Sequence, residues 1–142
     1  MSDLTLPATY NCGVRLTNRT RIIVAVWAVG FIVGTVTHTI DLLAGGINVY
    51  AGFPEPVKWF WISLTALDPL VVMLLALRSR AAAPVAVLVM VADLAVNWTV
   101  FFTVGGLSLF GVLSQSIFGV FVFATAAHVW RWWTAASRGP RR

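Results

Sequence analysis

Four long apolar runs are the feature that most limits what this chain can fold into. They cover about residues 22–44, 57–77, 81–103 and 107–129. A helix needs about 20 apolar residues to cross the roughly 30 Å hydrocarbon core of a bilayer. The sequence lacks the alternating ten-residue pattern of a membrane barrel, so the runs indicate helices. Because the connections are short, the sequence predicts an all-α, integral membrane four-helix up-down bundle.

The composition agrees with a membrane protein and excludes other classes. Apolar residues make up 59% of the 142 residues and charged residues only 11%, against about 25% charged in soluble domains. A soluble domain of this size could not bury so much apolar surface, and a disordered chain has the opposite composition. The net charge of +5 does not indicate a nucleic-acid partner, because the basic residues flank the apolar runs. We therefore expect a lipid bilayer around the protein and no nucleic acid.

The positions of the basic residues predict an orientation. Nine of the ten precede the first run, separate the second from the third, or follow the fourth, and Lys58 is the exception. Cytoplasmic segments of membrane proteins are enriched in Lys and Arg, so both termini are expected in the cytoplasm. The predicted organisation is an N-terminal segment 1–21, a transmembrane domain 22–130 and a basic tail 131–142. The expected location is a bacterial plasma membrane, crossed several times.

Three of the five acidic residues, Asp41, Asp68 and Asp93, fall inside apolar runs. A carboxylate at the bilayer centre costs roughly 2.5–3.5 kcal/mol on insertion scales, so such residues normally face the bundle interior and serve function. Asp68 and Asp93 are expected near the midplane, and Asp41 nearer the outer surface. These acids predict a pocket that opens toward the outer leaflet or the outer aqueous face, with two carboxyl groups at its floor.

Helical spacing places further polar and aromatic side chains near these acids, because residues three or four apart share a face. We predict catalytic roles for four residues, namely Asp93, Asp68, Asp41 and His38. We predict substrate-binding roles for six more, namely Asn97, Gln115, Trp61, Trp98, Thr65 and Phe101. A carboxylic acid in an aromatic-lined pocket can protonate an alkene or epoxide while the rings stabilise a cation. The hypothesis is an acid–base enzyme that acts on a lipophilic small molecule.

Two short patterns carry a resemblance to known families. His38-x-x-Asp41 and Asp93-x-x-x-Asn97-Trp98 resemble the signature of small membrane isomerases of the emopamil-binding kind and of small integral-membrane terpene cyclases. The resemblance covers about a dozen positions. It implies an isoprenoid or sterol-like substrate, with Asp68 or Asp93 as the acid and His38 and Asp41 as its partners.

Two other functions also fit an acidic intramembrane pocket. A proton-coupled transporter or channel subunit would use carboxyl groups that titrate, and with four helices it would need to form a homo-oligomer. A non-enzymatic assembly protein would use the same polar residues to bind partner helices. We predict no cofactor and no metal. His38 and His128 lie at different depths and cannot ligate one haem iron, Lys58 is too near the surface for a retinal-type linkage, and no metal-binding spacing is present.

Overall fold

The computed structural model describes residues 17–136, which form four long α helices and no strand. The helices are α1 (Asn18–Gly45), α2 (Glu55–Ala76), α3 (Ala82–Thr103) and α4 (Leu109–Ala136), and a short 3-10 helix, η1 (Gly46–Asn48), follows α1. Each of the four long helices is long and apolar enough to cross a membrane. The all-helical architecture is therefore confirmed, and it suggests a multi-pass membrane protein.

The first and last helices extend beyond the apolar runs. α1 begins at Asn18 rather than at residue 22, and α4 continues to Ala136 rather than ending at residue 129. Thr17 caps α1, because its Oγ1 accepts a hydrogen bond from the Thr20 backbone N–H at 3.2 Å. A helix can extend beyond its apolar residues as long as its backbone hydrogen bonds are made. The length of an apolar run therefore gives only the minimum length of the helix. Residues 1–16 and 137–142 of the two predicted terminal segments lie outside the described residues.

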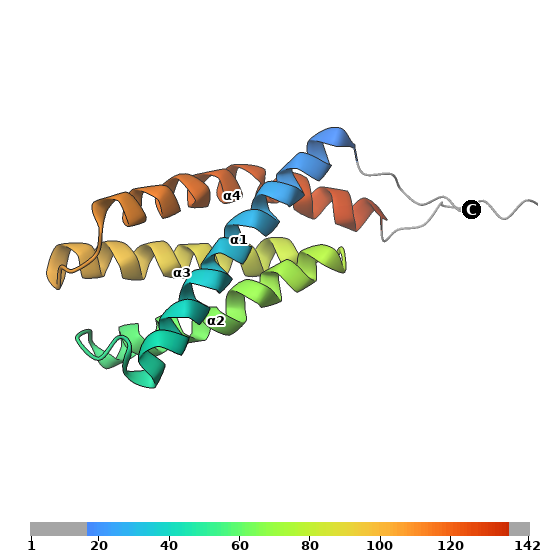
Figure 1. Cartoon of the computed structure of the whole chain (residues 1–142). Coiled ribbons are helices and arrows are strands. Elements are labelled where there is room, and N and C mark those ends of the chain that lie inside the picture. The colour runs from blue at the N-terminus through green and yellow to red at the C-terminus, as the bar shows by residue number, and fades with distance from the viewer. Residues whose placement is uncertain (1–16, 137–142) are drawn as a thin grey trace, which may run out of the picture.

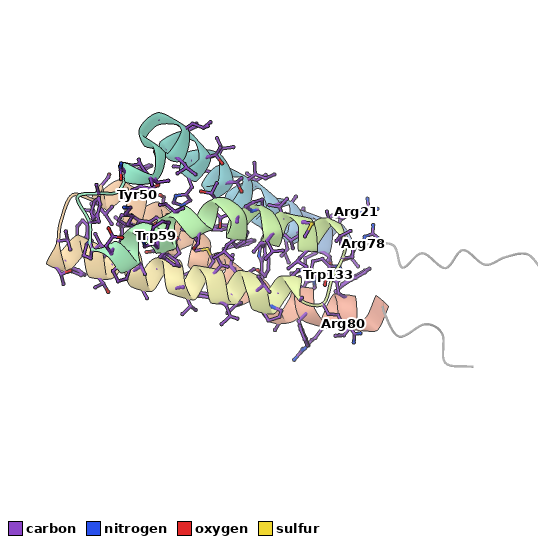
Figure 2. All side chains as sticks on the ribbon, turned by 90° about the horizontal axis from the view of Figure 1, so that it is seen from below. Arg21, Tyr50, Trp59, Arg78, Arg80 and Trp133 are labelled. Carbon is purple, nitrogen blue, oxygen red and sulfur yellow. The ribbon has the colours of Figure 1, made fainter. Side chains whose placement is uncertain are left out.

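The arginines labelled in Figure 2 gather at one end of the bundle, whereas Lys58 lies beside Trp59 at the other. Arg21, Arg78 and Arg80 lie together at the first end, while Tyr50 and Trp59 lie at the opposite end (Figure 2). We call these the arginine end and the Tyr50 end. α1 begins and α4 finishes at the arginine end (Figure 1). The up-down order expected from the short connections is therefore observed.

The four helices enclose a shared core, but α1 is not parallel to the others. α1 packs most extensively on α2 and α3 on α4, and smaller α2–α3 and α1–α4 contacts close the ring. Figure 1 shows α1 running obliquely across the bundle, near α4 at the arginine end and away from it at the Tyr50 end. Trp27 and Phe31 of α1 are almost fully buried, as are Leu64, Val71 and Val100. Almost fully buried side chains therefore lie both near the arginine end, such as Val129, and near the Tyr50 end, such as Val100.

The outer surface of the bundle is strongly apolar. Large apolar side chains are exposed on every helix, including Leu43, Met73, Leu88, Phe102 and Ile117. Monomeric soluble proteins rarely expose continuous apolar surface of this extent. The surface therefore suits contact with lipid.

Candidate functional site

A cavity of about 720 Å³ lies within the bundle, lined by residues of all four helices and of the two loops at the Tyr50 end. This volume lies within the roughly 300–1,000 Å³ range of small-molecule sites. Seven residues predicted from the sequence line it, namely His38, Asp41, Trp61, Asp68, Asp93, Asn97 and Gln115. The expected convergence of polar side chains from the four helices is therefore observed.

Three predicted substrate-binding residues do not line this cavity: Trp98, Phe101 and Thr65. The Trp98 indole N–H donates to Ser116 Oγ at 3.0 Å, and its ring packs against Phe101 with 5.8 Å between ring centroids. The Thr65 hydroxyl is buried without a hydrogen-bond partner among the described residues. Leu64 occupies the place expected for Thr65, because the cavity-facing stripe of α2 runs from Trp61 through Leu64 to Asp68.

Asn97 connects three helices at one wall of the cavity. Its Oδ1 accepts a hydrogen bond from the Trp61 indole N–H at 2.8 Å. Its Nδ2 donates to Asp93 Oδ1 at 2.9 Å and to Gln115 Oε1 at 2.6 Å. An indole nitrogen can only donate, so the orientation of the amide follows from its partners. Both amide hydrogens are satisfied, and the network fixes Asp93 against the cavity wall.

Asp68 differs from Asp93 in having no hydrogen-bond partner within residues 17–136, although it is only 6% exposed. Its carboxyl group lines the cavity and lies against Gly34 of α1, where an added Cβ would overlap Asp68 Oδ2. Glycine at position 34 therefore makes the space that this carboxyl group occupies. Buried polar groups are normally paired, so an unpaired carboxyl group in a cavity is available to a bound molecule.

Tyr50 joins His38 and Asp41 in a polar cluster near the Tyr50 end. The Tyr50 hydroxyl donates to Asp41 Oδ2 at 2.8 Å and lies 3.3 Å from His38 Nδ1. Since its one hydrogen is directed at Asp41, the His38 Nδ1–H must be the donor to the Tyr50 oxygen. Burial, together with the hydrogen bond to Asp41, raises the pKa of Tyr50 well above its usual range. Tyr50 therefore remains a hydrogen-bond donor.

Sequence reasoning missed Tyr50 and three aromatic lining residues. Tyr50 and Phe53 both pack edge-to-face on Trp61, with centroid separations of 5.1 and 4.8 Å. Phe31 and Phe118 pack together at 5.4 Å deeper in the bundle. All four line the cavity. The only available signal was a tyrosine in the Gly- and Pro-rich segment that follows His38-x-x-Asp41.

No protein-family model matches this sequence, and no curated protein or solved structure matches it. Among residues 17–136, no group of three or more His, Cys, Asp or Glu side chains is arranged to hold a metal ion. The case for a function therefore depends on the cavity and its own side chains.

Proposed function

We propose that the chain crosses a bacterial plasma membrane four times, with the arginine end in the cytoplasm. The support is the placement of Arg21, Arg78 and Arg80 at one end of four apolar helices (Figure 2). Short cytoplasmic segments carry an excess of Lys and Arg, and this excess sets orientation. In this orientation the cavity lies in the outer half of the membrane.

The function that the cavity supports best is acid–base catalysis on a lipid-soluble, isoprenoid-like molecule. One observation carries this proposal: Asp68 is buried in a cavity without a hydrogen-bond partner in the described chain. A purely structural acid would have a hydrogen-bond partner within the bundle, because buried polar groups are normally paired. Placing an ionisable side chain inside a membrane is unfavourable in free energy, so such side chains normally serve a function.

The chemistry needs no group beyond the two aspartates. The protonated Asp68 carboxyl group gives its proton to a carbon–carbon double bond, whose π electrons form the new C–H bond. The neighbouring carbon becomes cationic and is stabilised by the Trp61 and Phe118 rings, which line the cavity. The Asp93 carboxylate then removes a proton from an adjacent carbon, and that electron pair forms the shifted double bond. Return of the proton from Asp93 to Asp68 completes an isomerisation.

The His38–Tyr50–Asp41 cluster would hold the polar end of the substrate. It offers an acceptor at Asp41 and the remaining lone pair of Tyr50 near the Tyr50 end of the cavity. A polar group held there directs the hydrocarbon part toward Asp68 and Asp93. Positioning of this kind supplies much of the rate enhancement of many enzymes.

A proton-coupled transporter is the second candidate. It is favoured by the position of acidic groups both near the Tyr50 end, at Asp41, and deeper in the same cavity, at Asp68. A transporter in liposomes would carry protons down a pH gradient, and Asp68→Asn would abolish that flux. The enzyme would carry none.

The enzyme proposal is tested by mass analysis of lipids that copurify with the protein from its native membrane. Asp68→Asn should retain an unreacted isoprenoid-like molecule, whereas the wild type and the control Glu55→Gln should retain its double-bond isomer. Glu55 is a suitable control because it is largely exposed and outside the cavity. If no lipid is enriched with any of the three folded proteins, the enzyme proposal is wrong.

A further inference from the structure

The hydrogen bonds and ring contacts between α1 and α4 lie between the arginine end and the middle of α1. Thr20 Oγ1 lies 3.0 Å from His128 Nε2, and the Trp27 indole N–H donates to Thr125 Oγ1 at 2.9 Å. The last such contact along α1 is between the Phe31 and Phe118 rings. Beyond it, no hydrogen bond or ring contact in the described chain joins the two helices, and Figure 1 shows them diverging.

The cavity reaches the molecular surface where α1 and α4 diverge. Val33 of α1 lines the cavity and is also 59% exposed. Thr37 on the next turn of α1 is exposed as well, and so are Ser108 and Ser114, at and beyond the start of α4. Side chains that face both the cavity and the surroundings form its opening. The opening therefore lies on the side of the bundle, between two membrane-spanning helices.

Aromatic rings cover part of the cavity end that would face water. Tyr50 and Phe53 pack on the Trp61 ring. The Phe53 ring also lies against Gly106 in the loop between α3 and α4, 3.5 Å from the position that a Cβ would take there. The loop from α1 to α2 thus reaches the loop from α3 to α4 and forms a roof.

The charges in the cavity restrict what it can hold. Three carboxyl groups line it, at Asp41, Asp68 and Asp93, and no Lys or Arg of the described chain does so. A phosphate group entering it would meet carboxyl groups and no Lys or Arg side chain to pair with. A neutral polar group such as a hydroxyl can instead donate to Asp41.

We infer that the gap between α1 and α4 is a lateral portal, through which a long-chain molecule with an uncharged polar end enters the cavity from the outer leaflet. The hydrocarbon chain lies among the aromatic rings, and the polar end lies at the His38–Tyr50–Asp41 cluster. The reaction of this molecule rests on the proposed function. The entry and the binding of the molecule do not depend on the proposed function.

Photolabelling tests the portal. The full chain is reconstituted in phosphatidylcholine vesicles, a long-chain alcohol carrying a diazirine is added, and adducts are mapped by mass spectrometry after brief illumination. Adducts are expected on Met90 and Phe118, inside the cavity. Val33→Trp should slow their formation about tenfold, since access limits the rate. Val29→Trp is the matched control, because Val29 is 61% exposed on the same helix but does not line the cavity.

Three further measurements test lateral entry, the uncharged polar end and the proposed reaction separately. Ser114→Trp fills the opposite edge of the portal and should act like Val33→Trp. The phosphate ester of the same alcohol should give few adducts in the cavity. If both portal variants are labelled as fast as the wild type, lateral entry is wrong. If the phosphate ester labels the cavity as fast as the alcohol does, the uncharged polar end is wrong. Asp68→Asn should still be labelled, so a failure of the proposed reaction is distinguishable from a failure of the portal.

Discussion

At the scale of single residues, two buried polar side chains lining one cavity have opposite environments. Asn97 is 5% exposed and makes three hydrogen bonds, to Trp61, Asp93 and Gln115. Asp68 is equally buried and makes none within residues 17–136. A side chain that makes hydrogen bonds to neighbouring helices stabilises a bundle, whereas a buried carboxyl group without a partner lowers its stability. Stability and function are therefore expected to depend on different residues.

Replacing Asn97 with Leu should destabilise the protein by about 2 kcal/mol. Hydrogen bonds between membrane helices average about 0.6 kcal/mol each. The substitution removes two of them, to Trp61 and Gln115, together with the bond to Asp93 within α3. Asp68→Asn should change the free energy of unfolding by less than about 0.5 kcal/mol, because no hydrogen bond is lost. Equilibrium unfolding in mixed detergent micelles measures both. Asn48→Leu, at an exposed site in η1, is the control. An Asn97→Leu protein as stable as that control would contradict a stabilising role for the Asn97 hydrogen bonds.

At the scale of the elements, the glycines of α1 set how its neighbours approach. A Cβ at Gly30 would overlap the Phe118 ring of α4, and one at Gly34 would overlap the Asp68 carboxyl group of α2. One glycine therefore permits helix packing, and the other permits the position of a site residue. The two substitutions should have different consequences.

Gly34→Ala should leave the fold intact and abolish turnover. The displaced atoms belong to the end of the Asp68 side chain, which can rotate away from its place in the cavity. Gly30→Ala should instead lower the free energy of unfolding by about 1–3 kcal/mol, because it crowds a packed ring. Gly52→Ala is the control, since nothing lies within 4 Å of an added Cβ there. Full turnover by a stable Gly34→Ala protein would argue against the placement of Asp68.

Arg78 at the end of α2 is in the left-handed conformation, with φ of 52°. The Ser79 N–H reaches back to the Leu74 carbonyl at 2.9 Å, as in a helix end built for glycine. Arg78→Gly should therefore raise the free energy of unfolding by about 1 kcal/mol. Arg78→Ala loses the same charge but keeps the backbone strain, so it should not raise the free energy of unfolding. Equal stability of the Gly and Ala variants would show that the strain is absent.

The lengths of the apolar runs predicted the four helices, and helical spacing predicted seven residues that line the cavity, because residues three or four apart must share a helical face. Spacing placed Asp68, Asp93 and Asn97 on one interior surface, where the structure has them. It selected Thr65 on α2 where the structure has Leu64, since successive residues differ by about 100° in direction and packing sets the rotation. It also could not place Tyr50, because the position of a loop side chain depends on the loop conformation.

At the scale of the whole molecule, the oblique course of α1 makes the cavity. α1 meets α4 near the arginine end and leaves it toward the Tyr50 end (Figure 1). A bundle of four evenly packed helices would fill this space with side chains. The up-down order of the helices brings every labelled arginine to one end (Figure 2), which predicts how the molecule sits in the membrane.

Thiol labelling tests that orientation in the full chain. In a Cys12→Ser background, Ser79→Cys between α2 and α3 should react with a membrane-impermeant maleimide only after the cells are opened. Gly52→Cys at the opposite end should react in intact cells, because positively charged loops stay inside. The reverse pattern would invert the proposed topology and place the cavity in the inner half of the membrane.

The central claim is that Asp68 transfers a proton to carbon, and deuterium incorporation tests it most directly. The protein is reconstituted with its native lipid extract in D2O, and the lipids are analysed by high-resolution mass spectrometry. The account predicts that one lipid class gains deuterium with the wild type and with Glu55→Gln, and gains none with Asp68→Asn. Deuterium gained equally with folded Asp68→Asn, or by no lipid with the folded wild type, would contradict it.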